Sequence, residues 1–571
     1  MFVAVFSRSL SARTFGIGCL LLFIVALVLR TTGLDWGDVH PDENPSAPAK
    51  ALAGNFVPDV HYYPPFFNYV IALAYAQLYV IGRIANWWNS ADSFRAAYFS
   101  DKLTFILVAR LVAACVSAAA APFSAMLARE LKLPRSEALF IGVIVALFSG
   151  GVYWGRIAKG DNGIGPALLL FLLAAVRFRS DPTRMSRAVF LGFSIALSLS
   201  FKHSAIFFLA PAVVFVAITT ALERPLWSWF ASWFLAFMAA LIFWLPMNIG
   251  IVLDVKGFID AQIVQSQMSI RESDPIGAAK QWFDGITSIK AGIPLVFLIC
   301  WFFAVPIAMS FAQSSILRFG LRLMFFASLI GMATVALLAG QRQPTQLWLP
   351  YSTLILTAVL ITFFHFKSSS GTGIRLAAAG LIAFSALAFI ARDVAIIGEA
   401  LAEPLQPKIA LQLKQLPSGS RILSNIELSS AMSVSSIGEE EVRARNDRLA
   451  GKYNVALPKV AAESQRRRSD GYVVRPYPFV IGGLEELSER EFKVVLPYAW
   501  PIQLEEWEME YWRSLNYNIF VVVNHGYFEH KVVSYRKFFR SLREGCKETA
   551  LIKGPKPLFG QLDTYIYFCS T

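Results

Sequence analysis

The sequence predicts a polytopic α-helical membrane protein with a small α/β module at its C-terminal end. Hydrophobic residues make up 56% of the 571-residue chain and charged residues only 16%, with a mean hydropathy of +0.52. Soluble domains contain roughly half apolar and a quarter charged residues, so both departures favour a lipid-embedded chain. The apolar residues also come in long blocks up to residue 392, after which the composition becomes globular.

Eleven apolar blocks predict about eleven transmembrane helices, because about 20 apolar residues cross the hydrocarbon core as a helix. The blocks are Phe15–Leu29, Leu103–Leu127, Ala138–Trp154, Gly163–Val176, Ala188–Phe201, Ala205–Leu222, Trp229–Leu245, Ile293–Phe311, Leu323–Ala339, Thr345–Phe364 and Leu376–Ile390. No small-residue cleavage site follows the first block, so we expect a retained helix there rather than a signal peptide.

The short basic loops predict the orientation. Arg129, Lys132 and Arg135 follow the second block, and four arginines between 177 and 187 follow the fourth. Basic loops face the cytoplasm, and two crossings separate each such loop from the next, so eleven crossings leave the C-terminus outside. We expect a multi-pass inner (plasma) membrane protein with a cytoplasmic N-terminus and a periplasmic C-terminal domain. The net charge of +13 has the same topological origin, and we expect no nucleic-acid partner.

Phe66–Ile84 is apolar enough to be a further span, but a full crossing would move every later basic loop to the wrong side. The segment follows Tyr62 and Tyr63 and ends near Trp87 and Trp88, which are residues typical of a membrane interface. We therefore expect a helix that lies in, or dips into, the outer interface. The first external loop then runs over residues 31–102, and so long a loop is usually functional.

The chain divides into a transmembrane module over residues 1–392 and a soluble extracytoplasmic α/β domain over residues 393–571. Strand-like runs in the second part are Arg421–Ser424, Phe492–Leu496, Ile519–Val523 and Thr564–Phe568, and Tyr535–Arg543 is helix-like. Cys546 and Cys569 lie in this part and form a disulfide if it occupies an oxidising compartment. The sequence alone leaves that pairing open.

Two acidic sites lie on the same predicted face. Asp42 and Glu43 follow the first span, and adjacent carboxylates there can act as a general base or hold an acceptor hydroxyl. The alternative is a solvated loop that caps the next helix. Asp161 lies in the turn between the third and fourth spans, where it can hold an acceptor, a metal or a neighbouring cation.

Cations gather on that face as well, and charges at the mouth of a helix bundle are costly unless they are paired or functional. The candidates for binding a donor phosphate are Arg156, Lys159, Lys202, His203 and Arg342. An interfacial salt-bridge cluster is the alternative. Arg110 either extends to the interface or reaches the site, where it would contact substrate with His40, Tyr62 and Tyr63.

No cofactor is firmly implied by these residues. Asp42, His40 and Asp161 are candidate ligands for a divalent cation such as Mg²⁺ or Mn²⁺, but their spacing matches no strong ligand pattern. The chain also lacks a glycine-rich phosphate loop between a strand and a helix. That absence favours a lipid-phosphate donor over a nucleotide sugar.

The motifs occur in an order that resembles a known group of enzymes. The order is His40 to Glu43, Tyr63 before Pro64 and Pro65, Arg110 between Ala109 and Leu111, Arg156 with Asp161 five residues later, and Lys202 before His203 and Ser204. It resembles the protein O-mannosyltransferase and aminoarabinose transferase group of GT-C glycosyltransferases. In that group His or Lys often precedes the proline pair, whereas Tyr63 stands here.

The resemblance implies a mannosyltransferase-like helix bundle with its active site under the first external loop. It implies a polyprenyl-phosphate sugar donor, inversion at the anomeric carbon, and a glycan, lipid or protein acceptor. Under it, Asp42 is the catalytic acidic residue, Glu43 its partner and Asp161 the acidic residue of the second loop. Arg156, Lys202 and Arg342 would hold the phosphate.

Other functions stay open. An oligosaccharyltransferase would use a lipid-pyrophosphate glycan, but its Trp-Trp-Asp signature is missing, since Asn89 follows Trp87 and Trp88. A lipid or sugar transporter would place charged sites near the midplane, often with inverted repeats, and neither pattern is visible. A non-catalytic scaffold would tolerate loss of both acidic sites.

Overall fold

The computed structural model describes most of the membrane part and the framework of the C-terminal module. The described residues are 10–35, 43, 46–58, 61, 63–100, 102–269, 275–290, 292–339, 345–369, 372–403, 405–413, 415, 420–424, 473–476, 508–523, 533–554, 557–559 and 563–569.

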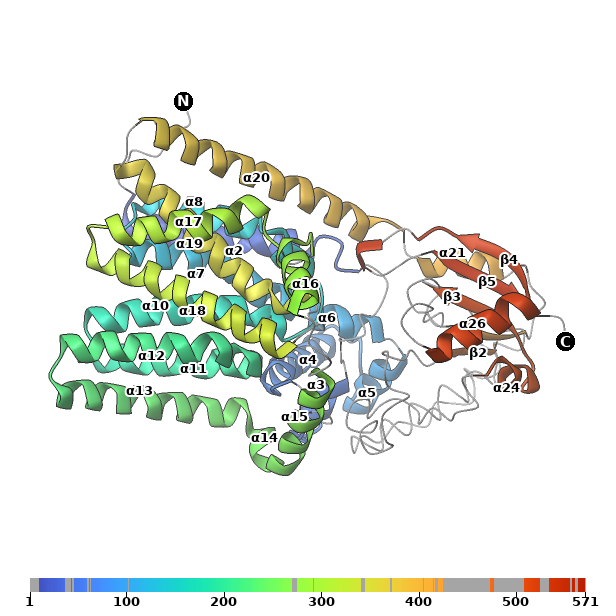
Figure 1. The fold of residues 1–571 in the computed structure, drawn as a ribbon. Helices are drawn as coiled ribbons and strands as arrows, with labels where there is room; N and C mark the ends of the chain where they lie inside the picture. Colours follow the sequence, from blue (N-terminus) through green and yellow to red (C-terminus); the bar gives the residue numbers. More distant parts are fainter. Residues whose placement is uncertain are drawn as a thin grey trace.

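All eleven predicted spans are helical, which confirms the predicted fold class of a polytopic helical bundle. They correspond to α2 (Ala12–Thr31), α6 and α7 (Lys102–Ala118, Ala120–Glu130), α8 and α9 (Arg135–Ala146, Ser149–Trp154), α10 (Asp161–Ser180), α11 (Met185–Phe201), α12 (Ile206–Glu223), α13 (Leu226–Met247), α17 (Leu295–Phe311), α18 (Ser315–Ala339), α19 (Leu349–Ser369) and α20 (Thr372–Leu401). These helices run alongside one another in a long bundle (Figure 1). The protein is therefore a multi-pass membrane protein.

The buried share of each helix distinguishes the central helices of the bundle from the peripheral ones. Within the apolar windows, 83% of α10 and 89% of α19 are buried inside the protein, against 11% of α2 and 17% of α13. A helix that is apolar and buried all round belongs at the centre of a bundle, whereas apolar residues exposed on α2 and α13 face lipid. Because α10 begins at Asp161, this central helix presents a carboxylate at its first turn.

The helix α4 (Phe66–Ile84) is one of nine helices in the described chain that are long and apolar enough to span a membrane. That count leaves out α11 and α17, which have 17 residues each, and the broken pair α8 and α9. In Figure 1, α4 lies at the end of the bundle that faces the C-terminal module. Tyr69 of α4 donates to the Phe56 carbonyl (2.7 Å) and accepts from the Gly250 amide (3.1 Å). Tyr69 is thus bonded to the segment before α4 and to the segment after α13. The interfacial position of α4 stays a prediction.

Short helices surround α4 at this end of the bundle (Figure 1). They are α3 (Ser46–Leu52), α5 (Ala91–Ser100), α14 (Ile249–Leu253), α15 (Val255–Ser269) and α16 (Pro275–Thr287). The first external loop and the segment after α13 therefore build one cap over the bundle.

The C-terminal module is a five-stranded mixed sheet in the order β2-β1-β3-β5-β4. Its strands are β1 (Arg421–Ser424), β2 (Val473–Pro476), β3 (Tyr517–Val523), β4 (Lys547–Ile552) and β5 (Thr564–Phe568). The first three strands are parallel, and β5 runs antiparallel to both β3 and β4. The helix α21 (Leu405–Leu413) packs with inward residues of one sheet face. On the other face pack α24 (Met509–Ser514) and α26 (Val533–Gly545).

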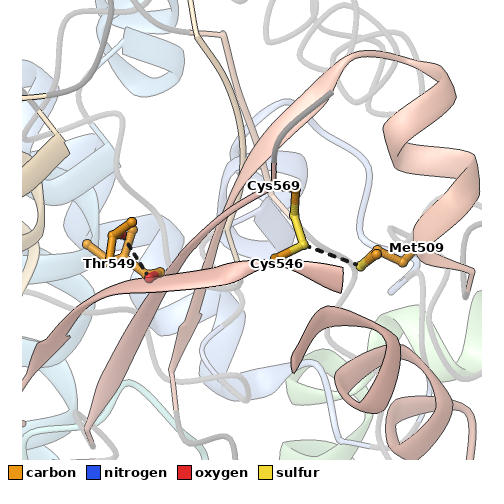
Figure 2. Close-up of a disulfide and its surroundings, with 5 residues drawn as sticks. Met509, Cys546, Thr549 and Cys569 are labelled. Carbon is orange, nitrogen blue, oxygen red and sulfur yellow. Dashed lines mark hydrogen bonds between the residues drawn. A yellow bond between two sulfur atoms is a disulfide. The ribbon is translucent and has the colours of Figure 1, made fainter. Parts of the chain in front are cut away.

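Three of the predicted strands and the predicted helix are present, while Phe492–Leu496 lies outside the described residues. The sequence did not reveal β2 or β4, because both are edge strands without an alternating apolar face. The predicted domain boundary at residue 392 falls inside α20, which continues to Leu401. Cys546 and Cys569 are joined in a disulfide (Figure 2).

Candidate functional site

Asp161 and two lysines form a buried charge cluster at the first turn of α10. The Lys202 ammonium, just after α11, contacts Asp161 Oδ1, and Lys159 Nζ lies 3.5 Å from Asp161 Oδ2. Both ammonium groups also lie over the Tyr63 ring, at 5.5 Å for Lys159 and 5.4 Å for Lys202. The structure thus brings together four of the residues that the sequence singled out.

The physical chemistry of this cluster favours an anionic ligand. The Asp161 side chain is fully buried and that of Lys202 is 12% exposed, so the local dielectric is low. Two ammonium groups contact the same carboxylate. The N-terminus of α10 adds a positive partial charge at the same place, and a helix N-terminus favours an anionic group such as a phosphate.

A pocket leads from this cluster into the bundle between α10, α12, α18 and α19. Asp161 and Lys202 contribute its charged lining. The other lining residues are mostly apolar: Ile164, Leu168, Ser204, Ala205, Phe208, Val335, Gln346, Leu347, Pro350 and Tyr351. Leu168 is two helical turns beyond Asp161, so the apolar wall extends about 10 Å along α10. A polar mouth with an apolar wall suits an amphiphile.

Two histidines, His61, which is buried, and His203, which is partly buried, both contact the Phe258 ring. The His203 ring lies 5.1 Å from the Phe258 ring and the His61 ring 6.2 Å from it. His61 Nε2 lies 2.9 Å from Asp254 Oδ2, and this hydrogen bond is the main cause that lowers the pKa of the Asp254 carboxyl. Among the described residues, neither His203 Nε2 nor His61 Nδ1 has a hydrogen-bond partner. The sequence could not reveal Asp254, which is 193 positions from His61.

Glu43 is held in a bidentate ion pair with Arg110 of α6. Arg110 Nε donates to Glu43 Oε1 and Nη2 to Oε2, both at 2.8 Å, and the two side chains are 0% and 1% exposed. Glu43 Oε1 also accepts from the Ala158 amide at 2.8 Å, and Arg110 Nη1 donates to the Leu34 carbonyl. This pair ties the first external loop to the turn before α10. Arg110 is fully buried against Glu43, and the substrate contact predicted for it stays a prediction.

Arg156 is buried and bonds to main-chain carbonyls at the end of α2. Its Nη2 donates to the Leu29 carbonyl (2.6 Å) and the Thr32 carbonyl (3.0 Å), and its Nη1 to the Val152 carbonyl. The last carbonyls of a helix have no partner within the helix, so Arg156 satisfies groups that would otherwise be buried unpaired. Arg156 therefore fixes the turn before α10 to the end of α2. The phosphate contact predicted for Arg156 stays a prediction.

Comparison with solved structures finds the same fold. The ArnT structure from Cupriavidus metallidurans in the apo state superimposes with a TM-score of 0.50 at 13% identity, covering 98% of each chain. The fold is that of the GT-C membrane proteins. The same ArnT bound to undecaprenyl phosphate (TM-score 0.44, 14% identity, 96% and 97% covered) is also similar. So is the oligosaccharyltransferase AglB from Archaeoglobus fulgidus (0.43, 12%, 89% and 69%).

Sequence comparisons add nothing to this fold assignment. No protein-family model matches the chain, and no curated protein sequence matches it. At 13% identity the structural likeness concerns the fold, and the GT-C arrangement by itself does not assign a reaction.

Four predicted site residues lie outside the described residues of this GT-C fold: His40, Asp42, Tyr62 and Arg342. Their roles stay predictions. Within the described ranges, no group of three or more His, Cys, Asp or Glu side chains could hold a metal ion. The candidate ligand Asp161 is instead engaged by Lys159 and Lys202.

Proposed function

We propose that this protein is a membrane glycosyltransferase that moves a monosaccharide from a polyprenyl-phosphate donor to an extracytoplasmic hydroxyl. The observation that carries the proposal is the buried cluster of Asp161, Lys159, Lys202 and Tyr63 at the mouth of an apolar pocket. A polyprenyl-phosphate sugar combines an anionic phosphate, an apolar tail and a sugar ring. The cluster complements the phosphate, and the mostly apolar lining of the small pocket beside it matches the character of the tail.

The donor would place its phosphate against Lys202 and Lys159. Preorganised cations in a water-poor site stabilise the charge that develops on the leaving phosphate. Asp161 holds both ammonium groups in place before the donor arrives, and the Tyr63 ring lies beside them. Gln346 and Leu347, which line the pocket, follow Arg342 by only four and five positions in the sequence, and this supports the predicted phosphate contact for Arg342.

Asp42 is our proposed general base. Its neighbour in the chain, Glu43, accepts a hydrogen bond from the Ala158 amide in the turn before α10, and this supports the choice. Asp42 would take the proton of the acceptor hydroxyl while that oxygen attacks the anomeric carbon. The bond from the anomeric carbon to the phosphate oxygen breaks, and polyprenyl phosphate leaves from the opposite face, which inverts the configuration.

Donor turnover by the purified protein in lipid nanodiscs tests the proposal. A panel of synthetic polyprenyl-phosphate sugars is supplied with a membrane extract as the acceptor source, and slow donor hydrolysis is scored as well. We expect Asp42→Asn to abolish transfer and Lys202→Met to lower it at least about a hundredfold, the loss typical of removing one stabilising group. Lys408→Met, on α21 of the C-terminal module, is the matched control and keeps its turnover.

Two results would contradict this function. Near-normal transfer by Asp42→Asn and Lys202→Met would remove the site from the reaction. Failure to use or bind any monophosphate donor, with turnover of a lipid-pyrophosphate glycan instead, would make the protein an oligosaccharyltransferase. Repeating the assay with EDTA, and then with Mg²⁺ or Mn²⁺, shows whether a divalent cation takes part.

A further inference from the structure

The antiparallel strands β4 and β5 form a hairpin at the edge of the C-terminal sheet, and a disulfide closes its base. We call residues 546–569 the finger. The disulfide joins Cys546, directly before β4, to Cys569, directly after β5 (Figure 2). Beyond the strands, Lys553 Nζ lies 2.6 Å from Asp563 Oδ2, and the Gly554 amide donates to Asp563 Oδ1 at 3.1 Å. Two cross-links thus hold the finger together.

The tip of the finger, Pro557–Phe559, docks into the helix bundle. The Leu558 amide donates to Glu399 Oε2 of α20 at 2.8 Å, and the Leu558 carbonyl accepts from Tyr153 Oη at 2.7 Å. The Phe559 ring stacks on the Tyr153 ring with centroids 5.2 Å apart and is only 6% exposed. Side chains of the bundle thus bond to both the amide and the carbonyl of Leu558. The position of the tip is therefore fixed by directional hydrogen bonds as well as by apolar packing.

The element that receives the tip leads directly into the candidate site. Tyr153 belongs to α9, which ends at Trp154, and the turn of residues 155–160 follows it to Asp161. Three residues of this turn make contacts in the candidate site. Arg156 donates to carbonyls at the end of α2, the Ala158 amide donates to Glu43, and Lys159 pairs with Asp161. A displacement of α9 would therefore be transmitted to the anchor of Glu43 and to one of the two lysines.

We propose that the finger is a positioning element for the turn of residues 155–160, with Leu558 and Phe559 acting through Tyr153. An effect of the finger on catalysis rests on the proposed transferase function. The mechanical link, by which the finger positions the turn through Tyr153, does not depend on that function. The finger connects the C-terminal module, which faces the extracytoplasmic side in our topology, to the residues that would hold donor and base. Docking of the module thereby completes the site.

Hydrogen–deuterium exchange on the full-length protein in nanodiscs measures the link without any substrate. Phe559→Ala removes the stacked ring, and Leu551→Ala removes an apolar side chain from a 43% exposed position on β4 of the same finger as the matched control. We expect Phe559→Ala to raise exchange of the amides of residues 155–160 at least about tenfold. The free energy lost when a buried Phe side chain is removed is larger than the free-energy difference that corresponds to a tenfold change. Tyr153→Phe keeps the ring and loses one donor, so its effect is smaller.

Donor turnover of the same variants gives the second readout. We expect kcat to fall about tenfold in Phe559→Ala, a change of about 1.4 kcal/mol in the barrier, and to stay unchanged in Leu551→Ala. If wild-type protein uses no donor while exchange of residues 155–160 still rises in Phe559→Ala, the link stands and the transferase function fails.

The positioning role is overturned if the Leu558 amide exchanges faster in Phe559→Ala while residues 155–160 keep their protection. It is equally overturned if exchange rises throughout the bundle, since the substitution then acts on general stability.

Discussion

Buried charged groups near the candidate site lie in three different surroundings. Glu43 forms a closed pair with Arg110, and Asp161 is shared by Lys159 and Lys202. Asp393 of α20 is buried near Arg30 and Arg156, and among the described residues its two oxygens have no hydrogen-bond partner. Glu43 and Arg110 form a bidentate pair, whereas the two lysines contact a single carboxylate. The proposed donor site rests on the second arrangement.

Glu43→Gln should destabilise the protein strongly. The amide keeps the shape of the side chain but removes the carboxylate charge that pairs with the fully buried Arg110 guanidinium. Breaking a buried pair by removing one partner costs about 3–5 kcal/mol, while removing both charges costs much less. We expect Glu43→Gln to lower the thermal midpoint of the detergent-solubilised protein by several degrees, as followed by loss of the monodisperse chromatographic peak.

The double variant Glu43→Gln with Arg110→Met is the control for that experiment. It should recover most of the lost stability, because no uncompensated charge remains. If the double variant is as unstable as the sum of the two single variants, the pair contributes little as a pair, and the loop is anchored by other contacts.

At the scale of single elements, an ionisable contact between Asp254 and His61 joins the segment after α13 to the first external loop. Asp254 follows α14, accepts from the Gly257 amide at 3.0 Å and pairs with His61 at 2.9 Å. The His61 carbonyl in turn accepts from Gln262 of α15 at 2.8 Å. These contacts join α14 and α15 to the loop that precedes α4.

Acidification should release this contact at low pH. The hydrogen bond from His61 lowers the pKa of Asp254, and a carboxyl with a lowered pKa contributes stability above its unfolded pKa of about 3.9. That contribution is lost as the pH falls through the lower, folded pKa. We expect protection of α14 and α15 against hydrogen exchange to be constant from pH 8 to 5 and to fall below about pH 4. Asp254→Asn should remove this step.

An identical acid step in Asp254→Asn would contradict that explanation and assign the transition to other carboxyls. Asp284 on α16 provides a matched comparison, since Asp284→Asn removes a carboxylate from the same cap without touching the His61 contact.

Sequence patterns predicted the elements whose own residues specify them. The strands β1 and β5 agree with the predicted ranges, and all eleven apolar blocks became helices, because hydrophobic length and alternation are local properties. Contacts between residues far apart in the chain could not be predicted from the sequence. Asp254 and His61, or Leu558 and Tyr153, meet only after the chain has folded, and neither pair has a spacing that marks it. Glu43 was recognised as a site residue, but its pairing with Arg110 required the structure.

At the scale of the whole molecule, the candidate site and the basic loops lie at opposite ends of the bundle. The central helix α10 begins at Asp161 and carries Arg177 and Arg179 in its last turn, about 25 Å away along the axis. Arg177 pairs with Glu130 and Arg179 with Glu223, which end α7 and α12. The C-terminal module lies at the end opposite to these arginines (Figure 1). If the basic end is cytoplasmic, the site and the module are both extracytoplasmic.

The disulfide tests that topology, because structural disulfides persist in oxidising compartments and are rare in the cytosol. We expect protein extracted from cells in the presence of an alkylating agent to show Cys546 and Cys569 paired, with a gel shift by a maleimide-coupled polymer at these positions only after reduction. Cys569→Ser should expose the Cys546 thiol to a membrane-impermeant maleimide and destabilise the module by about 3 kcal/mol, the value for closing a loop of this size. Free thiols at both positions in freshly alkylated protein would place the module in the cytoplasm. The basic loops would then face outward, and a donor site under the first external loop would be on the wrong side of the membrane for the proposed reaction.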